Sequence, residues 1–83
     1  MVDLARTPNQ IGTLVRRARK RMGLTQRELG LRTGLRQETI SLVEGGNPAT
    51  RLDTILTILA ALDLELQVAP RSRRSSDLQD LIG

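Results

Sequence analysis

Apolar residues recur at steps of three and four along most of this chain, which is the period of helices that bury one face. Glycines at positions 23 and 34 and a Gly-Gly-Asn-Pro sequence at 45–48 interrupt the pattern and divide it into four segments. Helices are expected from Pro8 to Met22, for about two turns from Gln26, from about Arg36 to Glu44, and from about Thr50 to Leu62. The chain has 83 residues, so the pattern predicts one small, mainly α domain.

The apolar positions of these segments identify the side chains expected in the core, which are Ile11, Leu14, Val15, Ala18, Met22, Ile40, Val43, Leu52, Ile55, Leu56, Leu59 and Leu62. Three threonines are each followed three residues later by a side chain that can complete a helix-capping box. The pairs are Thr7 with Gln10, Thr25 with Glu28 and, in a weaker pattern, Thr50 with Asp53. Leu24 and Leu29 flank the second pair as a hydrophobic staple.

After these helical segments the period changes to strict alternation. Leu64, Leu66 and Val68 are separated by polar residues, which predicts a β-strand over residues 64–69. A single strand leaves its backbone groups unpaired unless a second copy of the chain supplies an identical edge. We therefore expect a strand pair across the two-fold axis of a homodimer, with a frayed tail as the alternative.

The ends of the chain differ from the helical domain, which is expected to span residues 7–63. Residues 1–6 carry no periodic pattern and are expected to be flexible. Residues 70–83 begin with a polar stretch and are expected to form a flexible tail. Within that tail, residues 77–82 have the spacing of a fifth helix, although six residues are marginal for a free helix.

The composition excludes several classes of function. Histidine and cysteine are absent, so the usual general base at neutral pH and the commonest metal ligands are missing. We therefore expect no enzyme activity, no metal and no cofactor. Aromatic residues are also absent, which argues against the stacking platforms of most RNA-binding and single-strand-binding proteins. Apolar runs are far shorter than the roughly 20 residues that cross a bilayer, and the N-terminus does not resemble a signal peptide, so a cytoplasmic protein is expected.

Positive charge is concentrated in residues 16–36, which hold eight basic residues and one acid, a local charge of +7. The other 62 residues hold five basic and eight acidic ones, a charge of −3, and the whole chain carries +4. A basic block of this kind attracts polyanions, with a solvated helix face as the alternative. Twelve of the thirteen basic residues are arginine, which suits phosphate and guanine recognition.

Residues 26–44 hold two short helices joined by a tight turn at Gly34, the geometry in which a second helix enters the DNA major groove. This region reads LTQRELGLRTGLRQETISLVEGG and resembles the phage-repressor-type helix-turn-helix domains of the Xre/Cro class. The resemblance covers about residues 9–63 and implies a phage-repressor-like fold of four to five helices. The following stretch, TRLDTILTILAALDLELQVAPR, is similar to the last helix and dimerising strand of HipB-type antitoxins. Those proteins repress their own operon and bind a HipA-type serine/threonine kinase toxin.

The resemblance implies two sets of DNA-contacting residues. The exposed side of the third helix is expected to read bases through Arg36, Gln37, Glu38, Ser41 and Leu42. Gln37 matches the family's base-reading position, and a glutamine can bond to adenine N6 and N7. The start of the second helix and the turn before the fourth are expected to contact phosphates through Gln26, Arg27, Asn47, Thr50 and Arg51. For Thr50 the alternative is a helix cap alone.

The resemblance also implies a structural ion pair between Arg19 and Glu44, which joins the first helix to the end of the recognition helix, with a direct DNA contact of Arg19 as the alternative. Two residues depart from the family pattern. Arg36 stands where a serine or threonine cap is usual, so the third helix is expected to begin without a side-chain cap. Leu42 replaces a polar residue and either packs on a thymine methyl group or lies partly buried at the rim.

These features predict a sequence-specific repressor that binds double-stranded operator DNA as a homodimer. The more specific prediction is the antitoxin of a HipBA-like type II operon, which regulates its own expression and neutralises a kinase toxin. One alternative is a stand-alone repressor of phage or plasmid type without a toxin partner. Another is an inhibitor that binds protein only and does not read DNA.

Overall fold

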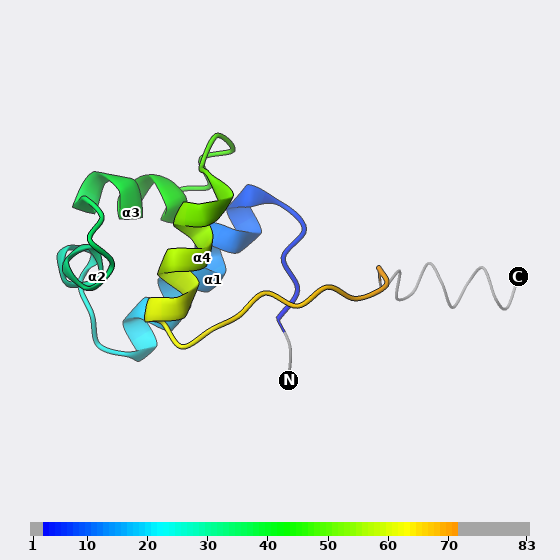
Figure 1. Cartoon of the computed structure of the whole chain (residues 1–83), viewed down its shortest axis with the longest axis horizontal. Helices are drawn as coiled ribbons and strands as arrows, with labels where there is room; N and C mark the ends of the chain where they lie inside the picture. The colour runs from blue at the N-terminus through cyan, green and yellow to red at the C-terminus, as the bar shows by residue number, and fades with distance from the viewer. Residues whose placement is uncertain (1–2, 72–83) are drawn as a thin grey trace, which may run out of the picture.

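The helices follow one another with short connections between them, of which the one at residues 45–51 loops outward (Figure 1). The computed structural model describes residues 3–71, so the predicted tail from residue 72 onward, including the helix expected at 77–82, lies outside the described residues. The helices of the described part are α1 (Pro8–Arg21), α2 (Gln26–Thr33), α3 (Gln37–Glu44) and α4 (Leu52–Ala61). Each lies where the sequence pattern predicts it.

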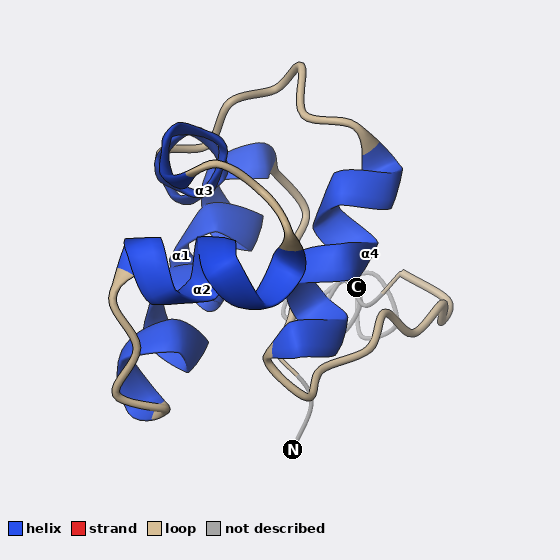
Figure 2. Ribbon diagram, turned by 60° about the vertical axis from the view of Figure 1, so that its left-hand side comes forward, coloured by secondary structure: helices blue, strands red, loops and turns tan. Residues whose placement is uncertain are grey.

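The helices α2 and α3 cross at a steep angle. Figure 1 shows α2 end-on and α3 from the side, and Figure 2 shows the reverse. The third helix packs on both α1 and α2, and α2 also packs on α4. Because α1 and α2 cover only the inner side of α3, its outer side faces solvent.

Side-chain caps begin the first two helices, but the box predicted for Thr7 and Gln10 is incomplete, because Gln10 Oε1 accepts from the Arg6 N–H and not from that of Thr7. Thr7 Oγ1 accepts from the Gln10 backbone N–H at 3.1 Å, with Pro8 in the first turn. In α2 the capping box is complete, because Thr25 Oγ1 accepts from the Glu28 N–H at 3.0 Å and Glu28 Oε1 accepts from the Thr25 N–H at 2.9 Å. These bonds satisfy backbone donors that the helix itself leaves unpaired.

The last two helices begin differently. Among the described residues, no side chain caps α3 or α4, and the N-cap positions are held by Arg36 and Arg51. This confirms the expectation for Arg36. The weaker capping pair of Thr50 with Asp53 is wrong, because α4 begins one residue later and the Thr50 hydroxyl donates instead to the Asn47 carbonyl at 3.0 Å.

Each helix contributes one completely buried side chain to the core, namely Val15, Leu29, Ile40 and Ile58. Six further apolar residues surround them and are nearly buried: Ala18, Leu24, Val43, Ile55, Leu59 and Leu62. Burial of each large aliphatic side chain contributes about 1.5–3 kcal/mol. The core therefore joins all four described helices and includes both members of the predicted staple.

The buried stripe of α4 differs from the predicted one. Ile58 is completely buried although the sequence pattern did not include it, whereas Leu52 and Leu56 are exposed. Both stripes have helical spacing, so periodicity alone did not decide between them. The stripe that lies in the core consists of Ile55, Ile58, Leu59 and Leu62. On α1, Met22 is likewise exposed, since it follows the last helical residue.

Two glycines permit features that position the recognition helix. Gly12 lies where a Cβ atom would come within 2.5 Å of the Val43 carbonyl oxygen and 2.6 Å of that of Glu44, so its lack of a side chain lets α1 approach the end of α3. Gly34 ends α2 with φ of 72°, the left-handed region that glycine adopts without strain. The turn between α2 and α3 depends on this conformation.

Residues 64–71 lie beyond α4 in neither a helix nor a strand and run away from the helical body (Figure 1). Leu64, Leu66 and Val68 are 38%, 50% and 102% exposed. A strand requires a partner, and the described single chain offers none to this segment. The strand pair across a homodimer therefore stays a prediction. Among residues 3–71, none of the helices has the length and apolar character needed to span a membrane.

Candidate nucleic-acid interface

The outer face of α3 brings together most of the residues predicted to read bases. Gln37, Glu38, Ser41 and Leu42 are exposed, and with Gln26 from α2 they line one shallow hollow. Arg36 is also exposed and stands just before this face, at the N-cap of α3. The opposite side of α3 carries the buried Ile40 and Val43. The recognition face is therefore polar, apart from Leu42, and directed outward.

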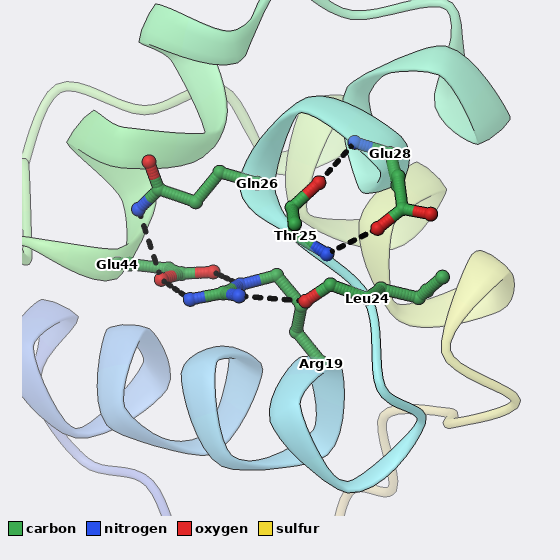
Figure 3. Close-up of polar contacts among 6 residues, drawn as sticks. All are labelled: Arg19, Leu24, Thr25, Gln26, Glu28 and Glu44. Atoms are coloured by element: carbon green, nitrogen blue, oxygen red, sulfur yellow. Dashed lines mark hydrogen bonds and ion pairs between the residues drawn. The ribbon is translucent and has the colours of Figure 1, made fainter.

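An ion pair holds the end of α3 against α1. Arg19 Nε lies 2.6 Å from Glu44 Oε2, and Arg19 Nη2 donates to Glu44 Oε1 at 3.0 Å (Figure 3). The two side chains are only 9% and 4% exposed. This is the ion pair that the resemblance implied, and it fixes how α3 is presented.

Two more contacts extend this pair into a small network (Figure 3). Arg19 Nη1 donates to the Leu24 carbonyl at 2.8 Å, which ties α1 to the turn before α2. Gln26 Nε2 donates to Glu44 Oε1 at 3.2 Å, which ties the start of α2 to the end of α3. The Glu44 carboxylate thus accepts from side chains of both α1 and α2.

The electrostatics of the network favour the charged form of Arg19. Its hydrogen bond to Glu44 raises the pKa of the guanidinium above its ordinary value, and the opposite charge of Glu44 adds to this effect. Burial acts in the other direction and is outweighed. Removal of one partner from a buried pair typically costs about 3–5 kcal/mol because it leaves the other charge uncompensated.

The residues predicted to contact phosphates lie in two places. Arg27 is exposed in the first turn of α2, beside Gln26, whose amide is partly occupied by Glu44. The others lie in the turn between α3 and α4, and these are Asn47, Thr50 and Arg51. Asn47 Oδ1 accepts from the Ala49 N–H at 3.1 Å, and its carbonyl accepts from the Thr50 hydroxyl. Asn47 and Thr50 therefore also shape the turn that carries Arg51.

Sequence reasoning missed the partner of Arg51. The Arg51 guanidinium forms a surface ion pair with Asp53, with two bonds of 3.1 Å each. The available signal was the spacing of two residues between Arg51 and Asp53 across the start of a helix. The sequence pattern instead pairs Asp53 with Thr50 as a helix cap. The described part of the chain holds no group of three or more acidic side chains that could bind a metal ion.

Two short helices joined by a left-handed turn, with the second helix presented outward, define a helix-turn-helix domain. A family model described as Helix-turn-helix matches residues 15–68, and the chain belongs to this family. Within the family it is similar to antitoxins. Antitoxin HipB of Escherichia coli O6:H1 is 32% identical over 78 residues, which cover 90% of this chain and 83% of that protein. An uncharacterised HTH-type transcriptional regulator of Sinorhizobium fredii is 40% identical over 57 residues, which cover 69% of this chain but only 29% of that longer protein.

Solved structures agree with these relatives. A HipB-O4 20mer complex has a TM-score of 0.79 at 30% identity, and the match covers 86% of this chain and 100% of that one. A HipA-HipB-O2-O3 complex has a TM-score of 0.77 at 32% identity, with the same coverage of both chains. The likeness therefore includes the arrangement of the helices as well as the sequence.

Proposed function

We propose that this chain is a homodimeric, sequence-specific DNA-binding repressor and the antitoxin of a HipBA-like toxin–antitoxin operon. The observation that carries the proposal is the outward polar face of α3, with Gln37, Glu38 and Ser41 around one hollow. The Arg19–Glu44 ion pair holds that helix in place. A helix presented in this way fits the major groove of B-DNA, which is about 12 Å wide.

In this proposal the residues of the α3 face read base edges. Gln37 bonds to adenine, Glu38 accepts from cytosine N4, and Ser41 bonds to a base edge or a phosphate. Arg36 binds guanine or a phosphate, and Leu42 meets an apolar group. The phosphate contacts come from both sides of α3, through Gln26, Arg27, Asn47, Thr50 and Arg51. Such contacts provide affinity and register, whereas the base contacts provide specificity.

The chain divides into functional segments in this proposal. Residues 7–63 form the DNA-binding domain, and residues 64–69 pair with the same segment of a second copy. The exposed and alternating Leu64, Leu66 and Val68 support this pairing, because a strand pair would cover them. Two copies then place two recognition helices in successive major grooves, at half-sites about 10 bp apart or somewhat further. A regulator of this kind acts in the cytoplasm, where its operator lies.

The antitoxin role rests on the HipB relatives. Antitoxin HipB covers 90% of this chain, and a solved neighbour holds HipB together with HipA. We propose that this chain likewise binds a HipA-type serine/threonine kinase and neutralises it. No catalytic step is assigned to the chain itself, since the family is one of helix-turn-helix regulators.

A footprint on the DNA upstream of its own gene tests the repressor proposal. At about physiological salt with excess competitor DNA, we expect two protected half-sites related by two-fold symmetry. Gln37→Ala with Ser41→Ala should abolish the footprint. Thr57→Ala is the matched control, because its exposed hydroxyl bonds only to the Asp53 carbonyl within α4. Binding that competitor removes uniformly would contradict sequence-specific repression and favour an inhibitor that binds protein only.

A stand-alone repressor is the second candidate, and the Sinorhizobium fredii relative favours it because its name gives a transcriptional regulator and mentions no toxin. Co-expression with any kinase encoded beside the gene separates the two candidates. An antitoxin should co-purify with the kinase and suppress its phosphorylation activity. A footprint without such a kinase partner would support the stand-alone repressor.

A further inference from the structure

The turn between α3 and α4 ends on a pair of opposite charges at the start of α4. Arg51 donates from Nε to Asp53 Oδ1 and from Nη2 to Asp53 Oδ2, both at 3.1 Å. The two side chains are 80% and 67% exposed. The guanidinium thus presents its two parallel donors to a carboxylate of its own chain, in the geometry that also binds a phosphate.

The turn holds this pair beside the recognition helix. Figures 1 and 2 show α3 and the turn along the same edge of the molecule. Two hydrogen bonds to backbone carbonyls fix the turn. The Asn47 N–H donates to the Leu42 carbonyl at 3.0 Å, and the Thr50 hydroxyl donates to the Asn47 carbonyl at 3.0 Å. A DNA strand that borders a groove occupied by α3 would therefore pass close to Arg51.

We propose that Asp53 restrains DNA binding by competing with a DNA phosphate for the Arg51 guanidinium. The inference rests on the proposed function and adds a residue that opposes it. To bind a phosphate through Nε and Nη2, Arg51 must turn away from Asp53. The carboxylate then stays near the phosphate as a like charge. Exposed ion pairs are weak, so the phosphate displaces the carboxylate at a modest cost. Asp53 thus lowers affinity for every DNA sequence alike, because a phosphate contact carries no sequence information.

The test compares two neutralising substitutions on a duplex that the wild-type protein selects from a random pool. Asp53→Asn should tighten binding by roughly two- to fivefold, as expected for the loss of one exposed competitor. It should change the slope of log K against log salt by less than about one, the value for a whole added phosphate contact, because Arg51 binds the phosphate in both proteins. Asp63→Asn is the matched control, because it makes the same charge change at the far end of α4. Asp63 has φ of 60°, which asparagine also adopts readily.

A double-mutant cycle assigns the gain to Arg51. In an Arg51→Gln background, Asp53→Asn should tighten DNA binding by no more than Asp63→Asn does. Equal gains from Asp53→Asn and Asp63→Asn in the wild-type background would overturn the proposal, since net charge alone would explain them. Weaker binding by Asp53→Asn would also overturn it, because Asp53 would then position Arg51 for the phosphate.

Folding and the proposed function are checked separately. Asp53 lies in the first turn of α4, so thermal unfolding of each variant checks whether the substitution destabilises the domain. Asp53→Ser also removes the charge and should reproduce the effect of Asp53→Asn on DNA binding. Selection of no consensus duplex by the wild-type protein would instead contradict the proposed function. If the wild-type protein selects a consensus duplex but the Asp53 substitutions leave its affinity unchanged, this inference alone is contradicted.

Discussion

Glu44 is the residue on which the orientation of α3 depends, through its carboxylate. Its side chain is 4% exposed and accepts from Arg19 and Gln26, which belong to two other helices. A charge in such a place is tolerated only because it is paired and hydrogen-bonded. The network therefore links the stability of the domain to the orientation of its recognition helix.

Glu44→Gln should destabilise the domain by about 3–5 kcal/mol, because it leaves the Arg19 guanidinium buried without its counter-charge. Urea unfolding followed by circular dichroism measures this loss. Glu38→Gln is the control, since Glu38 is exposed on the same helix and should change stability by at most about 0.5 kcal/mol. A loss below about 1 kcal/mol for Glu44→Gln would show that the ion pair is not what holds α3.

Leu42 stands more than half exposed in a hollow that is otherwise lined by polar side chains. The apolar group that the major groove offers to such a side chain is the thymine C5-methyl. Replacing thymines of the operator by uracil, one at a time, should therefore weaken wild-type binding about fourfold at one position per half-site, as expected for the loss of one buried methyl. Leu42→Ala should lose this sensitivity. A wild-type protein that tolerates uracil at every position would rule out the methyl contact.

At the scale of elements, sequence predicted best where local chemistry decides the structure. The box of Thr25 and Glu28 and the left-handed Gly34 depend on neighbours within one turn, so α2 could be predicted with its correct ends. The burial of Ile58 could not be predicted, because periodicity allows more than one apolar stripe on α4. The Arg51–Asp53 ion pair could not be predicted either, because Asp53 suits a helix cap as well as an ion pair. The Arg19–Glu44 pair joins residues 25 positions apart, and resemblance rather than local pattern indicated it.

The capping box of α2 should make stability depend on pH. Hydrogen bonds from the Thr25 backbone and then its side chain lower the pKa of Glu28 below its ordinary value. A lowered folded-state pKa means that this contribution is complete above the unfolded-state value, about 4.3, and is lost as the pH falls through the folded-state value. Wild-type protein should therefore lose more stability than Glu28→Gln between pH 6 and pH 3.

Urea unfolding at several pH values measures this difference. Thr57→Ala, which lies on α4 and leaves the box intact, should keep the wild-type dependence on pH. Parallel curves for wild type and Glu28→Gln would show that the box contributes nothing that depends on the charge of Glu28.

At the scale of the whole molecule, the helical domain supplies one recognition helix, and in the proposed homodimer the segment after α4 joins it to the recognition helix of a second copy. A single α3 would contact only a few base pairs, whereas two copies joined as proposed through residues 64–69 would bind as one unit and gain from the high effective concentration of the second site. The exposed Leu64, Leu66 and Val68 alternate with Glu65 and Gln67, so one side of a paired strand would be apolar and the other polar.

Leu66→Lys should therefore convert the dimer to a monomer, because it places a charge on the apolar side of the strand pair. Gln67→Lys is the matched control on the polar side and should leave the dimer intact. Sedimentation at micromolar concentration measures the change, and binding to the two half-sites should lose its cooperativity in Leu66→Lys alone. If both variants remain dimers, the copies associate through another surface, such as the exposed Leu52 and Leu56 of α4, and residues 64–69 serve a different contact.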